Sequence, residues 1–255
     1  MSWAARRRFF ILLILGAVVA AFIAILSIAT LYKSPTCTDG VENQGEAGID
    51  CGGPCSFLCA ELQQPPTVLF TKAFTDSTTG RTVVVASIEN KNNTSAAKNV
   101  PYHAILYGPN RTLIQSVAGT IDLPPGATAT VFVPNIISGK QTVVSAFLNI
   151  DAISINWFTM TVDPRIVPGV SNTIQGGTTD APRIEAILAN GSTATLTNVK
   201  TVVLVRDSSR EVIAASQTIV PVIHPQGTAS AIFTWNSAFQ GMPASIEIVP
   251  IMPLL

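Results

Sequence analysis

The sequence has few charged residues, and the two signs of charge balance. Only 12% of the 255 residues are Asp, Glu, Lys or Arg, with 15 basic and 15 acidic side chains. This share is about half of the roughly 25% usual in globular proteins. Because no excess of positive charge is present to attract a polyanion, nucleic acid is not expected among the partners.

Residues and motifs that usually perform catalysis are also scarce. The chain has two histidines, His103 and His224, and they lie in different halves of the β-type region. It contains no G-x-S-x-G, H-E-x-x-H, P-loop or glycine-rich dinucleotide motif. The sequence therefore predicts that the protein is not an enzyme and that it has no catalytic or cofactor-binding residues.

Cysteine is absent outside one short segment. All four cysteines, Cys37, Cys51, Cys55 and Cys59, lie within 23 residues, and residues 60–255 contain none. In an exported chain such a cluster predicts two disulfides, whose three possible pairings the sequence leaves open. A zinc site built from the four thiolates is disfavoured, because an oxidising compartment removes thiolates.

The N-terminus carries a long apolar run, Phe9–Leu31, which follows Arg6, Arg7 and Arg8. Its 23 residues would form a helix of about 34 Å, enough to cross a hydrocarbon core of about 30 Å. Residues 1–33 are therefore predicted to be a cytoplasmic stub and a transmembrane helix, with the lipid bilayer as partner. The arginines predict that the N-terminus stays inside and the C-terminal part lies in the periplasm or at the cell surface. A cleaved signal peptide is the alternative, although its apolar core would be shorter, about 7–15 residues.

Residues 34–64 are predicted to be a disulfide-stapled linker. Its glycines favour tight turns, and it has too few apolar residues to form a core. Asp39, Asn43, Glu46 and Asp50 offer oxygen ligands on a glycine-containing loop, which suits a hard cation such as calcium. The alternative is that these acids merely face water.

The linker also resembles a short cysteine-rich motif of secreted and surface proteins, C-x-D-G-x-x-N-x-x-E-x-G-x-D-C-G-G-x-C. It is loosely similar to the acidic loops of thrombospondin type 3 repeats. It departs from an EF-hand, since it lacks the D-x-D-x-D-G start and the glutamate at position 12.

The remainder of the chain alternates short β-type segments with turn signals. Strands at a spacing of roughly 8–12 residues are typical of an antiparallel β-sandwich. No apolar stripe of helical period occurs after Leu31. In the first half, the predicted strands are Val68–Phe74, Thr82–Glu89, Tyr102–Tyr107, Leu113–Ile121, Ala127–Val133 and Thr142–Ile150.

This β-type pattern occurs twice at a nearly constant offset. Asn99-Val100 and Leu113-Ile114 match residues 99 positions later, and Pro124-Pro125-Gly126 and Thr130-Val131-Phe132 match residues 101 positions later. Several matches in order predict two tandem β-sandwiches, residues 65–160 and 161–255. The pattern resembles immunoglobulin-like domains of the FxLYD and late-embryogenesis-abundant type 2 kind, which implies a sandwich and little about activity.

Three smaller features complete the predictions from the sequence. Trp157 and Trp235 are expected to pack in cores or between domains. The apolar end, Ile246–Leu255, is expected to form the last strand, and its tail past Pro250 either closes the sandwich or docks on another chain. The N-x-S/T sequons predict surface loops at Asn92, Asn93, Asn110 and Asn190.

Together these features predict an all-β protein behind one transmembrane helix, which displays two immunoglobulin-like domains for protein–protein interaction in an envelope or surface assembly. Its partner would be another protein or a second copy of the chain. The alternative function is a calcium-dependent adhesion or sensor module with the metal site in the linker.

Overall fold

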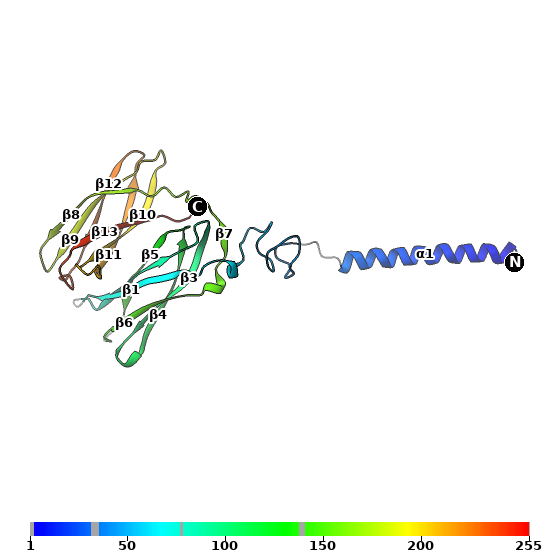
Figure 1. Cartoon of the computed structure of the whole chain (residues 1–255), viewed down its shortest axis with the longest axis horizontal. Coiled ribbons are helices and arrows are strands. Elements are labelled where there is room, and N and C mark those ends of the chain that lie inside the picture. The colour runs from blue at the N-terminus through cyan, green and yellow to red at the C-terminus, as the bar shows by residue number, and fades with distance from the viewer. Residues whose placement is uncertain (1–2, 32–35, 77–78, 138–140, 255) are drawn as a thin grey trace. The chain divides into compact units, whose positions relative to one another are not determined.

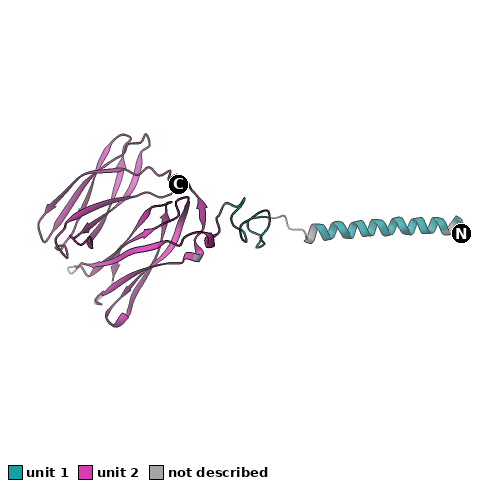
Figure 2. Ribbon diagram, in the orientation of Figure 1, with its two compact units in different colours: residues 1–56 teal, residues 57–255 magenta. Residues whose placement is uncertain are grey.

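A computed structural model describes residues 3–31, 36–76, 79–137 and 141–254. The chain divides into two compact units, Met1–Ser56 and Phe57–Leu255 (Figure 2). Residues 32–33 of the predicted membrane segment, residues 34–35 of the predicted linker and the last residue of the predicted tail lie outside the described residues. The first unit contains the N-terminal helix and most of the cysteine-rich segment, and the second unit contains all the strands described (Figure 1).

The N-terminal helix α1 (Trp3–Leu31) is apolar on every side. Its large apolar side chains from Phe9 to Ile28 are all exposed. Within it, Arg6–Ile28 is long and apolar enough to cross a membrane, by length and composition. A helix that is hydrophobic all round needs an apolar environment, since water would leave this surface unfavourably exposed.

The first sandwich consists of two antiparallel sheets. One sheet has the order β1-β2-β5 and contains β1 (Thr67–Thr75), β2 (Arg81–Glu89) and β5 (Thr128–Ile137). The other has the order β4-β3-β6, with β7 beside β3, and contains β3 (Ser95–Tyr107), β4 (Leu113–Leu123), β6 (Ser145–Ile150) and β7 (Trp157–Thr159). Short 3₁₀ turns lie at Ala60–Leu62, Pro109–Arg111 and Ala152–Ser154.

The second sandwich has the same strand order as the first. Its sheets are β12-β9-β8, equivalent to β5-β2-β1, and β11-β10-β13, equivalent to β4-β3-β6. The strands are β8 (Gly169–Gly177), β9 (Pro182–Ala189), β10 (Leu196–Arg206), β11 (Val212–Ile223), β12 (Thr228–Thr234) and β13 (Ser245–Ile251). The predicted all-β sandwich fold behind one N-terminal helix is therefore confirmed.

Each sandwich encloses a core of alternating side chains. In the first, Val84, Ala86 and Ile88 of β2 point inward, and Trp157 lies among the same buried residues with 1% of its surface exposed. In the second, Trp235 packs half-buried against the core. The prediction that both tryptophans pack in the interior is confirmed.

A buried asparagine closes the same corner of each sandwich. The Nδ2 of Asn90 donates to the carbonyls of Ser95 and Pro124, both at 2.8 Å. The Nδ2 of Asn190 donates to the carbonyls of Ala194, Ile223 and His224, at 2.7, 3.2 and 3.1 Å. Each asparagine has 1% of its surface exposed. The side-chain amide thus satisfies backbone groups that the turn would otherwise leave buried and unpaired.

The strand pairing also corrects the offset at which the two repeats were aligned. Val85 of β2 pairs with Phe132, and Glu185 of β9, 100 positions later, pairs with Ile232. Phe132 is therefore equivalent to Ile232, and the predicted match of Phe132 with Phe233, at an offset of 101, is wrong by one residue. In a strand, a slip of one residue moves every side chain to the other face. Phe233 lies in the core, whereas Phe132 packs outside it.

Gly119 lies directly across from Tyr102 in the β3–β4 ladder. A Cβ at Gly119 would collide with the Tyr102 phenol ring, which lies over this glycine. Tyr102 is buried, and burial raises the pKa of its phenol. An aromatic side chain that covers a glycine on the neighbouring strand is a known way to pack a sheet around a missing side chain.

We expect Gly119→Ala to lower the free energy of unfolding by about 1–3 kcal/mol, because the extra methyl group overpacks this site. Gly176→Ala is the matched control, since a Cβ there meets nothing within 4 Å. Chemical denaturation of both variants measures the difference. Equal midpoints for the two variants would contradict the close approach of Tyr102.

Candidate functional site

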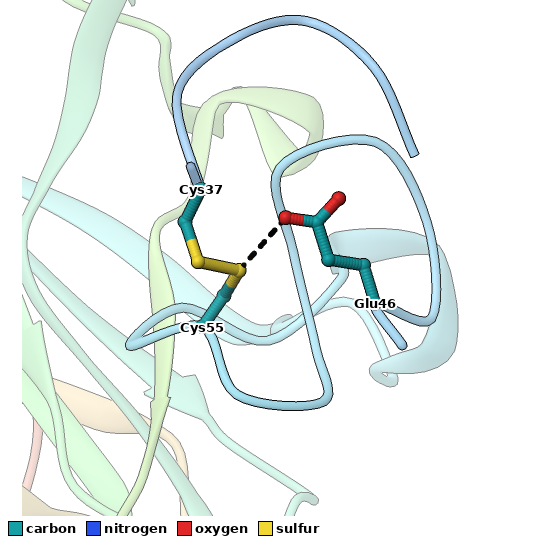
Figure 3. Close-up of side chains that lie close together, drawn as sticks. All are labelled: Cys37, Glu46 and Cys55. Atoms are coloured by element: carbon teal, nitrogen blue, oxygen red, sulfur yellow. Dashed lines mark hydrogen bonds between the residues drawn. A yellow bond between two sulfur atoms is a disulfide. The ribbon is translucent and has the colours of Figure 1, made fainter. Parts of the chain in front are cut away.

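The cysteine-rich segment is oxidised, as predicted. Cys37 and Cys55 form a disulfide with a Cα–Cα distance of 5.6 Å (Figure 3). Cys51 and Cys59 are also disulfide-bonded, and the structure contains no free cysteine among its described residues. The pairing that the sequence left open is therefore decided for Cys37 and Cys55.

Glu46 lies against this disulfide and is itself buried. Its Oε1 is 3.1 Å from the Cys55 sulfur, the dashed contact in Figure 3. A disulfide sulfur carries no proton, so this is a close contact between a sulfur and a carboxylate. Oε2 accepts hydrogen bonds from the backbone N–H groups of Asn43 and Asp50, at 3.3 and 3.2 Å. The carboxylate thus fixes the path of the loop beside the disulfide.

Two further acids hold the turns of the same loop. The Asp50 carboxylate accepts hydrogen bonds from the backbone N–H groups of Asp39 and Gly40, at distances of 3.0 to 3.1 Å. The Asp39 carboxylate accepts from the Val41 N–H at 2.9 Å and from the Asn43 Nδ2 at 3.1 Å. Carboxylates that accept backbone N–H groups in this way stabilise tight turns.

The glycines of this loop permit its tight turns. Gly53 has φ +55°, and a Cβ there would collide with the carbonyl oxygen of Gly45. Gly52 has φ +70°, and a Cβ there would lie 2.6 Å from the Cβ of Ala47. The C-G-G-x-C sequence therefore meets a steric requirement of the loop.

The predicted calcium ligands lie on one loop, but most of their oxygens already accept hydrogen bonds. Glu46 accepts from the N–H groups of Asn43 and Asp50, and Asp39 accepts from the Asn43 side chain, so the loop connects all four residues. The Oδ1 of Asn43 is buried and has no hydrogen-bond partner among the described residues. Sulfur offers no ligand, because the only carboxylate–cysteine group with metal-like spacing in the described residues, Cys37, Glu46 and Cys55, contains the disulfide.

A second region of interest joins the two sandwiches within the second unit. A shared cluster contains Val85 from the β1-β2-β5 sheet and Val202 and Leu204 from the β11-β10-β13 sheet. These three side chains are at most 1% exposed. Val84 and Val203, their neighbours in sequence, lie in the two separate cores. The central strands β2 and β10 are therefore buried on both faces.

Polar contacts also join the two sandwiches. Lys72 and Glu211 form an ion pair of 2.6 Å. The Arg206 guanidinium lies 5.1 Å from the centre of the Phe70 ring. At the chain end, the backbone N–H of Leu254 donates to the Asp122 carboxylate at 2.8 Å. Leu254 is buried, so the described part of the predicted tail docks on its own chain.

A cavity of about 530 Å³ opens beside the shared cluster. Phe74 and Arg81 line it from the first sandwich, and Trp235 and Phe239 line it from the second. The Trp235 and Phe239 rings meet edge to face at 5.0 Å, and the Trp235 Nε1 donates to the Ala215 carbonyl at 3.3 Å. Trp235 and Phe239 thus pack on each other and against the second core, while Phe74 packs against the shared cluster.

The two histidines lie on different sandwiches. His103 is exposed on β3 of the first sandwich, and His224 follows β11 of the second.

Asn190 was predicted to lie in a surface loop as part of a sequon, but its side chain is buried and bonded to three carbonyls. That prediction is wrong for Asn190. The sequence held a better signal, an asparagine at the same position of both repeats.

The fold and the oxidised segment define an all-β, disulfide-containing protein behind an apolar N-terminal helix, the features of a single-pass membrane or secreted protein. No protein-family model matches the chain, and no curated protein matches it.

Two of the solved structures that match are distantly similar to the chain. Red sea bream transglutaminase is 11% identical over 73% of this chain and 29% of its own, with a TM-score of 0.26. An exo-β-D-glucosaminidase CsxA is 13% identical over 68% of this chain and 26% of its own, with a TM-score of 0.18. The chain thus spans less than a third of either protein. Similarities at these TM-scores bear on neither its fold nor its activity.

Proposed function

We propose that this protein is a non-enzymatic, single-pass membrane protein that displays its two sandwiches outside the cytoplasmic membrane for protein–protein interaction. The observation that carries the proposal is the order of features along the chain. Within α1, an exposed apolar stretch follows Arg6, Arg7 and Arg8, and an oxidised segment follows the helix. Arginines favour the cytoplasmic side, and disulfides persist outside it.

Two aspartates of the second unit are held in place by hydrogen bonds. A hydrogen bond from Arg165 lowers the pKa of Asp163, and the ion pair between them measures 2.7 Å. A hydrogen bond from the Ser209 hydroxyl lowers the pKa of Asp207, which also caps the following turn. Each of these two carboxylates stabilises the loop in which it lies. The resemblance to FxLYD and late-embryogenesis-abundant type 2 domains fits the same proposal.

Extraction of membranes with alkaline carbonate tests the anchor. We expect the full chain to stay in the pellet, because α1 inserts in the bilayer, and a chain without residues 1–33 to be soluble. N-terminal sequencing of the mature protein separates the anchor from a cleaved signal peptide. A mature N-terminus beyond Leu31, with release of the protein by carbonate, would contradict the proposal.

A second candidate function is calcium-dependent adhesion or sensing through Asp39, Asn43, Glu46 and Asp50. The observation that favours it is the buried Oδ1 of Asn43, which no hydrogen-bond donor reaches within the part of the chain that the structure describes. Calcium is a hard cation that takes carboxylate and amide oxygens as ligands. We expect calorimetry of the oxidised full chain to show heat that Asn43→Ala removes and Asn93→Ala, in another loop, retains. Absence of binding at millimolar calcium would dismiss this candidate.

A further inference from the structure

The two sandwiches pack through unlike faces. The first contributes the outer face of its β1-β2-β5 sheet, and the second contributes the outer face of β11-β10-β13, which corresponds to β4-β3-β6 of the first. Each sandwich has two outer faces, and this contact covers a different one on each sandwich. Each sandwich is therefore left with one uncovered face, whose counterpart on the other sandwich is covered. The open faces are therefore the outer sides of β4-β3-β6 and of β8-β9-β12.

The first open face, here called face A, is the outer side of the β4-β3-β6 sheet. Its central row is Ser116, Ile105 and Phe147, which pair across the three strands. This row corresponds to Ala215, Leu204 and Glu247 of the second sandwich, where Leu204 is buried against the first sandwich.

Face A carries exposed apolar side chains beside the polar residues His103, Ser116 and Asn149. Phe147 and Leu113 are each 58% exposed. Tyr107 pairs with Leu113 across the sheet, and its ring meets that of Phe147 edge to face at 5.8 Å. Ala146 and Leu148, which flank Phe147 in the sequence, point into the core instead. Face A thus presents exposed apolar side chains in the position that the second sandwich uses for docking.

The second open face, here called face B, is the outer side of the β8-β9-β12 sheet. Its central row is Ile174, Glu185 and Ile232. Ile174 is 64% exposed and Ile232 is 42% exposed. This row corresponds to Lys72, Val85 and Phe132. Val85 and Phe132 pack against the second sandwich, and Lys72 forms its ion pair with Glu211 there.

Face B differs from its covered counterpart at several positions, because Ile174 and Gly176 take the places of Lys72 and Phe74 and an ion pair is added. Arg183 and Glu185 lie 2.9 Å apart, where the first sandwich has Val83 and Val85. Burial of this pair costs desolvation energy, but the two charges stay matched, so it weakens docking without preventing it. Contact through face B should therefore be weaker than the contact inside the chain.

We propose that a second copy of this chain docks face B on face A, which repeats between molecules the contact that joins the two sandwiches. The proposal rests on the proposed function and deepens it by naming the partner. The contact is heterologous, so each molecule keeps one free face after docking and association continues beyond dimers.

The test uses the full chain in detergent, with its mass distribution measured over a range of concentrations. We expect the wild type to form a concentration-dependent series of dimers and larger oligomers. Phe147→Asp disables face A and Ile232→Asp disables face B, so each variant alone should be monomeric. An equimolar mixture of the two should form dimers only, because each molecule retains the face that the other lacks. Val162→Asp removes an exposed apolar side chain outside both faces, and we expect it to behave as wild type.

Other results overturn the inference in distinct ways. Ile232→Asp oligomers like those of the wild type would mean that face A meets face A, or that α1 drives association. A wild type that stays monomeric at every concentration would remove the second copy as partner. In that case, capture of a different protein from the native host by the wild type, and loss of that capture in Phe147→Asp, would leave the proposed display function intact. Failure of the carbonate test would remove the display function itself.

Discussion

Replacement of Asn190 by Ala is expected to destabilise the second unit strongly. The Asn190 amide donates to the carbonyls of Ala194, Ile223 and His224, and its Oδ1 accepts from the N–H and hydroxyl of Ser192, at 3.0 and 2.7 Å. A buried group left without its partner costs about 1–3 kcal/mol. Because several groups lose their partner at once, we expect a loss of about 3 kcal/mol or more, and a fall in Tm of roughly 6–12 °C.

Scanning calorimetry of the full chain measures this loss. Asn236→Ala is the control, because Asn236 is exposed in a loop of the same sandwich. Asn90→Ala should show a similar loss, since Asn90 closes the equivalent corner. A Tm within a degree or two of wild type for Asn190→Ala would show that the corner contributes little.

Val85→Asp is expected to break the contact between the two sandwiches. Val85 is fully buried in the shared cluster with Val202 and Leu204. A carboxylate there would lose its hydration without a partner, at a cost of about 4 kcal/mol or more. We expect either global unfolding or two separate thermal transitions. Because burial favours the protonated carboxyl, the folded-state pKa of the new Asp would be raised, and the destabilisation should shrink as the pH falls toward about 4.

The chain supplies the control for this experiment. Glu185 is the equivalent residue of the second sandwich, on the face that the first sandwich does not cover. Glu185→Val should therefore leave the free energy of unfolding almost unchanged. If Val85→Asp proves no more harmful than Glu185→Val, the proposed contact between the sandwiches is wrong.

Much of the fold could be predicted from the sequence because local signals determine it. The apolar run predicts α1, and alternation with turn residues predicts the strands. Continuous apolar runs such as Val83-Val84-Val85 and Val202-Val203-Leu204-Val205 also indicate strands buried on both faces. The sequence does not say which sheet covers the outer side, because that depends on contacts between residues more than 100 positions apart.

Other features required the three-dimensional path of the chain. The four cysteines predict disulfides, but the choice of Cys37 with Cys55 depends on how the glycine turns fold the loop. The four predicted ligands share a loop, yet the sequence could not show that backbone N–H groups occupy most of their oxygens. The repeat register failed by one residue in β5 and β12, because Phe132 and Phe233 look alike in sequence but face opposite sides.

The most direct test of the account is labelling of the native protein with an amine reagent that does not cross membranes. Lys98 and Lys200 are exposed on the two sandwiches. In intact spheroplasts the account predicts full labelling of both lysines, at the level reached after permeabilisation, as measured by mass spectrometry of their peptides. Labelling of both lysines only after the membrane is permeabilised would place the sandwiches inside and contradict the account.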